Sequence, residues 1–232
     1  MINTYNSIAD KNPPIPEDKA LAESFKKVNI GAGLKFLVDD YEDPELREAI
    51  KKIPEKYVNI LNSPQDTYVH RGNWLFYPPN TVMPNGDYKF RAWIQHYGPG
   101  AQPNEIACIP ICFSDANGNK LSGENSYKMH FDKNHIPKHH PQGFWSISVY
   151  HTSNWWLIPN KWNKYRLNGD RDIKYNEDGS FDVIFSKKEP YNADAENWLP
   201  IGDDDFIVML RVYVGQGNVL DNTWQPPEIE KI

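Results

Sequence analysis

The sequence predicts a mainly β protein, an antiparallel sandwich or barrel that follows an N-terminal helical segment. Strand-like runs of alternating apolar and polar residues recur from about residue 68 onward, without helical runs between them. Turn signals rich in Gly, Asn and Asp separate these runs. The preceding residues instead repeat apolar side chains at the period of an amphipathic helix.

The first predicted helix begins near Asp18, a residue type that favours the N-cap position. Leu21, Phe25 and Val28 then fall on one face, at positions i, i+4 and i+7. Gly31 follows as a stop signal. This pattern predicts a helix between about residues 18 and 30.

A second helix is indicated by Asp43-Pro44, a capping residue followed by proline at the first helical position. Pro54 should end or kink this helix, because proline has no backbone N–H to donate. The apolar stripe of the helix is formed by Leu46, Ile50 and Ile53.

Three parts of the chain are therefore expected. Residues 1–17 are polar and rich in proline, which is typical of a flexible arm. Residues 18–66 form a helical segment that we expect to pack on the sandwich, and residues 67–232 form the sandwich.

The strands are predicted from runs with a period of two. The stretch DYKFRAWIQHYG alternates Tyr88, Phe90, Ala92 and Ile94 with more polar residues, which predicts a strand. A turn is predicted at Asn117-Gly118. Further strands are predicted at EIACIPICFSD, SYKMHF, FWSISVY, FDVIFS and FIVMLRVYV.

Composition excludes several classes of function. The net charge of −6 argues against binding to nucleic acid, which requires a basic surface. No run approaches the roughly 20 apolar residues that span a bilayer. The first residues lack the basic and apolar regions of a signal peptide, so a soluble, cytoplasmic protein is expected. No cofactor is expected either, since nucleotide-binding glycine patterns are missing, and no G-x-S-x-G motif supports acyl transfer.

Cys108 and Cys112 are four residues apart in a predicted strand, which separates them by roughly 13 Å. A disulfide needs Cα atoms closer than about 7 Å, so the two should not pair unless the chain bends at Pro110. Two reduced, partly buried thiols are expected. A metal site built on the CxxxC spacing is the alternative.

Several stretches occur in an order that resembles the family known as domain of unknown function 1214. They are GAQPNEIACIP, DANGNKLSGENSYKMHF, GFWSISVY, NKYRLNGDR, NEDGSFDVIF, NWLPIGDDDFIVMLRVY and VLDNTWQPPEIE, within residues 86–230. The resemblance implies a jelly-roll-like sandwich. It also implies that the N-terminal partner domain usual in bacterial relatives is missing here. Relatives in large algal viruses make a virion-associated location an alternative to a cytoplasmic one.

This chain departs from the family pattern in one loop region. His151 stands where an acidic residue is common, and NKYRLNGDR has one residue more than usual before Gly169. The stretch SNWWLIPNKW is also more aromatic than in relatives. A site in this region would therefore differ in specificity from that of relatives.

The aromatic loop within residues 151–171 is the first candidate site. Indole rings stack on sugars or other flat ligands while amide and charged groups hydrogen-bond them, and binding residues often lie on loops. Trp145 is expected in the core. At most one of Trp155 and Trp156 should form a platform, since neighbours in extended chain point in opposite directions. The remaining candidates in this loop are Asn154, Trp162, Asn163 and Arg171.

Polar residues on the predicted strands and in the family-like stretches form a second group of candidates, namely Arg91, Glu105, Tyr150, Asn163, Tyr165, Arg171 and Arg211. An Arg–Glu pair in a cleft could bind a carboxylate or act in acid–base chemistry, or it could instead fix the register of the sheets. Ser146 and Ser148 lie on the strand face opposite Trp145, and nothing marks them as nucleophiles.

Five histidines cluster in the sequence, and HIPKHH could supply metal ligands. Because three of them sit in a polar turn with lysines, a solvated loop is the preferred interpretation and no metal is assigned. The five residues are His130, His135, His139, His140 and His151.

Three functions from different classes remain open. The preferred one is a non-catalytic module that binds a glycan or another small polar ligand through the 151–171 loop. The second is an enzyme acting on a carbohydrate or other polar polymer, with Glu105 and Asp170 as an acid–base pair. The third is a structural, homo-oligomer-forming component, because exposed aromatic patches also mark interfaces.

Overall fold

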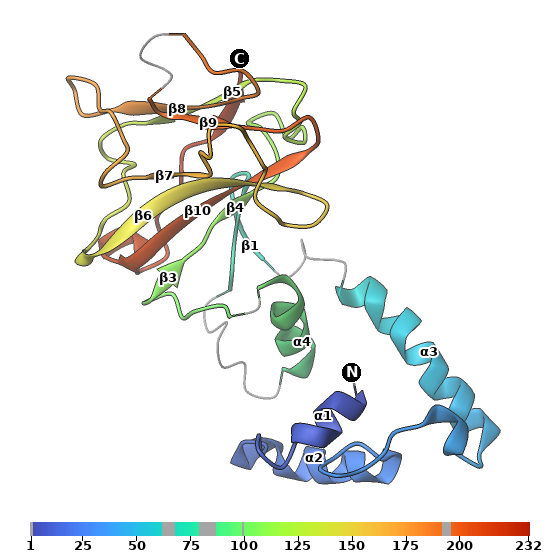
Figure 1. Ribbon diagram of the computed structural model, residues 1–232. Helices are drawn as coiled ribbons and strands as arrows, with labels where there is room; N and C mark the ends of the chain where they lie inside the picture. Colours follow the sequence, from blue (N-terminus) through green and yellow to red (C-terminus); the bar gives the residue numbers. More distant parts are fainter. Residues whose placement is uncertain (1, 62–67, 79–86, 99, 192–195) are drawn as a thin grey trace. The chain divides into compact units, whose positions relative to one another are not determined.

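The computed structural model describes residues 2–61, 68–78, 87–98, 100–191 and 196–232 (Figure 1). The chain divides into two compact units. The helical unit holds residues 1–63 and 85–92, and the sandwich unit holds residues 64–84 and 93–232. Residues 62–66, at the predicted boundary between helical segment and sandwich, lie outside the described residues, so this division and the predicted packing of the two parts stay predictions.

The helical unit contains helices α1, α2, α3 and the first half of α4. Helix α1 lies within the segment that is expected to be a flexible arm. The hydrogen bonds of Asn6 explain why this segment is folded. The side-chain amide of Asn6 donates to the carbonyl oxygens of Asn29 and Leu34, and its oxygen accepts from the backbone N–H of Gly31. The bounds are α1 Ile2–Ile8, α2 Lys19–Phe25, α3 Pro44–Leu61 and α4 Tyr88–Tyr97.

The predicted helix after Asp18 is confirmed, and so is the N-cap position of Asp18, but its side chain does not cap the helix. Asp18 occupies the N-cap position of α2 without a side-chain hydrogen bond to the helix. Its carboxylate instead accepts hydrogen bonds from Arg91 at 2.7 Å and from the Tyr88 hydroxyl at 2.9 Å. A charge-assisted bond to a guanidinium is stronger than a bond to a backbone amide, which explains the exchange.

Helix α3 begins as predicted, because the Asp43 carboxylate accepts from the backbone N–H groups of Glu45 and Leu46. Pro54 is expected to end or kink this helix, and of these two expectations the end is wrong. The helix runs through this proline to Leu61. Good helix formers on both sides of Pro54 maintain the helix despite the one lost backbone hydrogen bond.

The strand predicted at DYKFRAWIQHYG is also wrong, since Tyr88–Tyr97 is helix α4. The Asp87 carboxylate accepts from the Phe90 N–H, and the Asp87 carbonyl accepts from the Arg91 N–H. The same residues that alternate with a period of two also place Phe90 and Ile94 on one helical face. The N-cap at Asp87 decides between the two readings.

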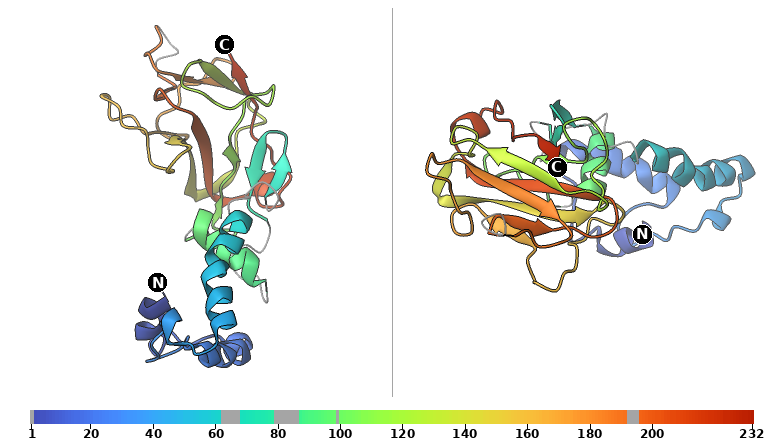
Figure 2. Two further views of the ribbon diagram at one scale, coloured as in Figure 1. Left: turned by 90° about the vertical axis from the view of Figure 1, so that its right-hand side faces the viewer. Right: turned by 90° about the horizontal axis from the view of Figure 1, so that it is seen from above.

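The sandwich unit has eleven strands in two sheets among its described residues, which confirms the mainly β class (Figures 1 and 2). The larger sheet has the order β1-β2-β4-β10-β6-β7, with β3 also paired to β10. Its strands are β1 Val69–Arg71, β2 Trp74–Phe76, β3 Ala107–Cys108, β4 Ile111–Cys112, β6 His139–His151, β7 Arg166–Asn168 and β10 Phe206–Gly215.

The smaller sheet has the order β11-β5-β8-β9. It departs from a purely antiparallel arrangement, because β8 and β9 pair in parallel. Its strands are β5 Tyr127–Phe131, β8 Phe181–Ser186, β9 Trp198–Pro200 and β11 Ile229–Lys231. The longer runs with a period of two are thus confirmed as β5, β6, β8 and β10. The strands β1, β2, β7, β9 and β11 are not predicted from the sequence. Each has three residues, which are too few to reveal a period of two.

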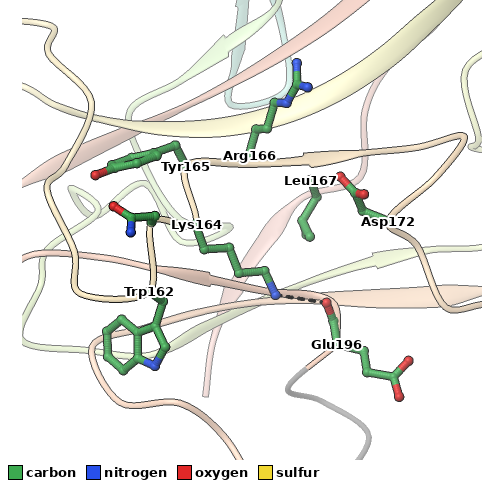
Figure 3. Close-up of a pocket in the computed structure, with 8 residues that line it drawn as sticks. Trp162, Lys164, Tyr165, Arg166, Leu167, Asp172 and Glu196 are labelled. Carbon is green, nitrogen blue, oxygen red and sulfur yellow. Dashed lines mark hydrogen bonds between the residues drawn. The ribbon is translucent and has the colours of Figure 1, made fainter.

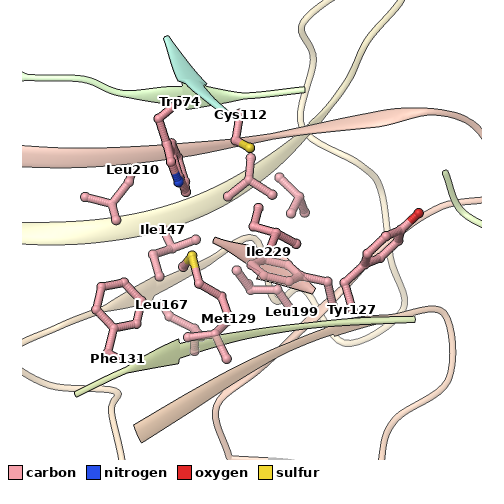
Figure 4. Close-up of a cluster of buried hydrophobic side chains, with 14 of the residues drawn as sticks. Trp74, Cys112, Tyr127, Met129, Phe131, Ile147, Leu167, Leu199, Leu210 and Ile229 are labelled. Atoms are coloured by element: carbon pink, nitrogen blue, oxygen red, sulfur yellow. The ribbon is translucent and has the colours of Figure 1, made fainter. Parts of the chain in front are cut away.

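The core lies between the two sheets (Figure 4). Trp145 belongs to it with 1% of its surface exposed, as predicted. Its ring lies against Phe131 and Phe181, with ring centroids 5.7 Å away in each case. Other core side chains come from both sheets and include Trp74, Met129, Ile147, Leu199 and Leu210.

Cys108 and Cys112 are both buried and free, as predicted. They lie on two short strands, β3 and β4, that both pair with β10. Burial raises the pKa of each thiol to about 12. Both side chains are therefore protonated and unreactive near neutral pH.

Candidate functional site

The aromatic loop follows β6 and presents its two neighbouring tryptophans differently. Trp156 has 73% of its surface exposed, and its backbone N–H bonds to the side chain of Asn154. Trp155 adopts a left-handed conformation with φ 62° and packs edge-to-face on Phe113, with centroids 6.0 Å apart. Of this pair, Trp156 is therefore the ring that is open to solvent.

Trp162 is held from three sides. Its indole N–H donates to the Glu189 carboxylate at 3.1 Å. Its ring stands perpendicular to that of Trp198, with centroids 4.7 Å apart, and the Lys161 ammonium lies 4.7 Å from its centroid. Because three contacts constrain the ring, Trp162 is a rigid wall rather than a free platform.

Asn160 explains why the chain turns back after Trp156. Its amide donates to the carbonyl oxygens of Ile158 and Lys164, and its oxygen accepts from the Lys164 N–H. Asn163 supplies the required left-handed residue with φ 53°, a conformation that asparagine tolerates better than most residues. These bonds place Trp162 and β7 on either side of a hollow.

That hollow is a pocket of about 690 Å³ beside β7 (Figure 3). In Figure 3 the rings of Trp162 and Tyr165 lie on one side of the Lys164 side chain, and Asp172 and Glu196 lie on the other. The lining therefore combines aromatic surface with groups of both charges. The lining residues are Trp162, Asn163, Lys164, Tyr165, Arg166, Leu167, Asp172 and Glu196.

Most charged groups of the pocket are fixed by contacts within the protein. The Lys164 ammonium donates to the Glu196 carbonyl oxygen, while the Glu196 carboxylate pairs with Lys174 at 2.8 Å. Asp172 accepts from the Asn168 N–H. Partial burial lowers the pKa of Lys164, although the carboxylates of Glu189, Asp172 and Glu196 oppose this shift.

Trp162 and Asn163 are the two predicted site residues that line this pocket. Asn154, Trp155 and Trp156 lie earlier in the same loop, and Arg171 is exposed in the turn after β7. Tyr150 is in β6, where the Arg211 guanidinium lies 5.3 Å from its ring centroid.

No ion pair between an arginine and a glutamate, as the second group of candidates suggested, is found among the described residues. Arg91 lies in α4 and pairs with Asp18, whereas Glu105 is exposed in the turn before β3. Asp170, the other carboxylate proposed for acid–base chemistry, pairs with His139 at 3.1 Å.

Four of the five clustered histidines each pair with one aspartate, and His140 instead accepts from the Gln142 N–H. His130 lies 2.7 Å from Asp182, and His135 lies 2.7 Å from Asp132. Across the described part of the chain, no three side chains of His, Cys, Asp or Glu gather as a metal site would require. The described helices likewise include none that is both long and apolar enough to cross a membrane.

Sequence reasoning missed Lys164, Arg166, Asp172 and Glu196 as pocket residues. The alternation in NKYRLN did carry a signal, since Leu167 points to the core and its neighbours must point outward. Nothing in the sequence indicates that Glu196 approaches this strand, because that contact spans more than thirty residues.

The fold and the pocket define an open β-sandwich with an aromatic-walled polar cavity. Residues 107–217 match the family described as protein of unknown function (DUF1214), so this part of the chain is similar to members of that family. The expectation about the N-terminal partner domain stays a prediction.

Two solved structures are similar to the chain. The VPA0106 protein from Vibrio parahaemolyticus matches with a TM-score of 0.62 and 22% identity, over 93% of this chain and 51% of that chain. An uncharacterised protein from Burkholderia cenocepacia matches with a TM-score of 0.35 and 12% identity, over 100% of this chain and 51% of that chain. The chain thus spans about half the length of each. No curated protein matches it.

Proposed function

We propose that the sandwich is a non-catalytic binding module that holds a glycan or another small polar ligand in the Trp162 pocket. The observation that carries this proposal is the combination of lining groups. Two aromatic side chains, Trp162 and Tyr165, share one cavity of about 690 Å³ with amide, ammonium, guanidinium and carboxylate groups. Flat rings suit the apolar faces of sugars, and polar groups at fixed positions suit their hydroxyls.

The rigidity of the lining supports binding rather than catalysis. Asp172 and Glu196 are both engaged within the protein, through the Asn168 N–H and Lys174 respectively. A glycosidase needs two carboxyl groups facing each other across the cleft and able to exchange protons. Preformed contacts instead lower the entropy cost of seating a ligand.

Thermal unfolding of the full chain against a panel of neutral and acidic oligosaccharides tests this proposal. A ligand at 100 times its Kd adds about 2.7 kcal/mol to the free energy of unfolding, which raises Tm measurably. We expect one sugar class to raise Tm. Tyr165→Ala should abolish the rise, and Trp156→Ala, in the same loop but outside the pocket lining, should leave it intact.

The reverse result would assign the site to the exposed ring. If Trp156→Ala abolished the rise and Tyr165→Ala did not, the pocket would not be the binding site. If no oligosaccharide changed Tm by more than the buffer control, the proposal would be wrong.

A homo-oligomeric role is the second candidate, and one observation favours it. Trp156 and Leu157 are adjacent, with 73% and 41% of their surfaces exposed. Exposed aromatic and aliphatic neighbours are typical of protein interfaces. Analytical ultracentrifugation should then show a dimer or larger species that Trp156→Ala converts to monomer. A monomer at high concentration would exclude this candidate.

A further inference from the structure

Strand β6 lies between β7 and β10, and the register of these pairs determines which side chains share a face. Ser146 of β6 lies opposite Asn168 of β7 and opposite Arg211 of β10. Residues directly opposite each other in a sheet project from the same face. The neighbouring Trp145 points into the core, so the three residues lie on the outer face of the sheet.

Asn168, Ser146 and Arg211 therefore form a row of hydrogen-bond donors across three adjacent strands, hereafter the donor row. Strands lie about 4.8 Å apart, so the row is roughly 10 Å long. Ser146 is 5% exposed and Asn168 is 9% exposed, while Arg211 is half-buried. A cationic group and two neutral donors thus share one nearly buried line.

The donors of this row lack good acceptors. The Ser146 hydroxyl makes no hydrogen bond with any described residue, and it is not one of the fully buried polar atoms that lack a partner. Asn168 uses its oxygen to accept from the Asp170 N–H. A nitrogen of the Arg211 guanidinium donates to the Met209 sulfur at 3.2 Å, and a thioether is a weak acceptor.

Arg211 also has no carboxylate partner in the described part of the chain. The ion pairs found among the described residues leave Arg211 out, although the chain carries a net charge of −6. A partly buried guanidinium normally pairs with an anion, because its desolvation is otherwise uncompensated. The donor row therefore offers a positive charge and hydrogen-bond donors whose side chains no carboxylate of the described residues contacts, the Asp172 carboxylate being bonded to the backbone N–H of Asn168.

Aromatic rings lie near the donor row in both directions along the strands, although on one side the row of Arg166, Ser148 and Met209 lies between. Phe144 and Tyr213 lie opposite each other in the next row and stack, with centroids 4.6 Å apart. Tyr150 lies further along β6 in the other direction, with the Arg211 guanidinium 5.3 Å from its ring centroid. Apolar surface therefore flanks the charged group.

We infer that the donor row binds the carboxylate of a small organic acid with an apolar body. The fork of one guanidinium matches a carboxylate in two parallel hydrogen bonds, and the Ser146 and Asn168 groups satisfy its remaining lone pairs. The donor row itself carries one positive charge, which matches the single negative charge of a carboxylate, and a second arginine, Arg166, lies in the adjacent row. This inference goes beyond the proposed function, because none of the three donor-row residues lines the Trp162 pocket. The two sites share only strand β7, which carries Asn168 and also borders the pocket.

NMR titration of the full chain with sodium benzoate tests the inference, with benzamide as the neutral probe of the same shape. We expect saturable shifts with benzoate and none with benzamide. Arg211→Gln should raise the Kd for benzoate about tenfold or more, the usual effect of losing a charged hydrogen bond. Arg47→Gln is the control, since Arg47 lies in α3 of the helical unit, where it donates to the Tyr41 carbonyl oxygen, and its Kd should equal that of the wild type.

Ser146→Ala guards against a folding defect, because it leaves the Arg211–Tyr150 contact in place. It should raise the Kd about two- to tenfold. Equal binding of benzoate and benzamide, an unchanged Kd in both Arg211→Gln and Ser146→Ala, or no saturable shift in the wild type would overturn the inference. Tighter binding of inorganic phosphate than of benzoate would overturn the assignment to carboxylates. None of these outcomes bears on oligosaccharide binding in the Trp162 pocket.

Discussion

The two units of this chain are stabilised in different ways. The sandwich unit has a core of fully buried aromatic and aliphatic side chains such as Trp74, Trp145 and Leu210. In the helical unit, Asn6, Ala9 and Gly31 are the buried ones among its described residues. The sandwich therefore depends on the hydrophobic effect, whereas the helical unit depends on a few specific polar contacts.

This difference indicates which of the two units can hold a rigid binding site. The strands that carry the pocket residues are fixed by the packed core of the sandwich. The geometry of the pocket is therefore set before a ligand binds. Helices with little burial open at low free-energy cost, which makes them poor supports for a precise site.

A matched pair of isoleucines gives the largest expected contrast. Ile147→Ala, at a position with 0% exposure, should lower the free energy of unfolding by about 2–5 kcal/mol. Ile53→Ala, at a position with 50% exposure in α3, should lower it by less than about 1 kcal/mol. Urea unfolding monitored by tryptophan fluorescence and circular dichroism measures both. Similar losses would show that Ile53 is buried in solution.

Gly169→Ala sharpens the argument about the sandwich core. A Cβ at this position would lie 1.8 Å from Cε2 of Trp145, which the core holds in place. We expect a loss of about 1–3 kcal/mol from overpacking, seen as a lower Tm in calorimetry. Gly100→Ala serves as the control, since no atom lies within 4 Å of its Cβ position, and its φ of 80° confines the cost to backbone strain. A harmless Gly169→Ala would mean that Trp145 can move.

Asn6→Ala addresses the helical unit. Removal of the side chain leaves the Gly31 N–H and the carbonyl oxygens of Asn29 and Leu34 without their partner. The expected cost is about 1–3 kcal/mol, confined to the helical unit. Hydrogen exchange should accelerate at the Gly31 amide and stay unchanged at the Leu210 amide in β10. Uniform acceleration in both units would contradict independent stabilisation.

The smallest expected effect is the acid dependence of the contact at Asp18. The hydrogen bond from Arg91, followed by that from Tyr88, lowers the pKa of this carboxyl below its ordinary value. A lowered pKa in the folded state stabilises the protein above the unfolded pKa of about 4, and this stabilisation disappears as the pH falls through the folded pKa.

Helical circular dichroism at decreasing pH measures the effect. The wild type should lose helix signal more steeply below about pH 4 than Asp18→Asn does. Identical acid profiles would show that the Asp18–Arg91 contact contributes nothing in solution, as many exposed ion pairs do.

Local sequence determined the class of fold, the longer strands, the reduced cysteines and the core position of Trp145. These features follow from periodicity, turn residues and burial preference, which act over a few neighbouring residues. Local sequence failed at Tyr88–Tyr97, where periods of two and of 3.6 fit the same residues and Asp87 decides for the helix. At Pro54 only the expected stop is wrong, because the flanking residues outweigh one lost hydrogen bond and the helix continues to Leu61.

Only the tertiary structure decided the candidate sites. The Trp162 pocket requires Glu189 and Glu196 to meet a loop some thirty residues earlier, and the donor row requires β7, β6 and β10 to align in one register. Such contacts depend on how strands order themselves in a sheet, which the pattern along any one strand does not specify. The sequence thus determined which faces are apolar, and the pairing of distant strands determined which polar groups stand together.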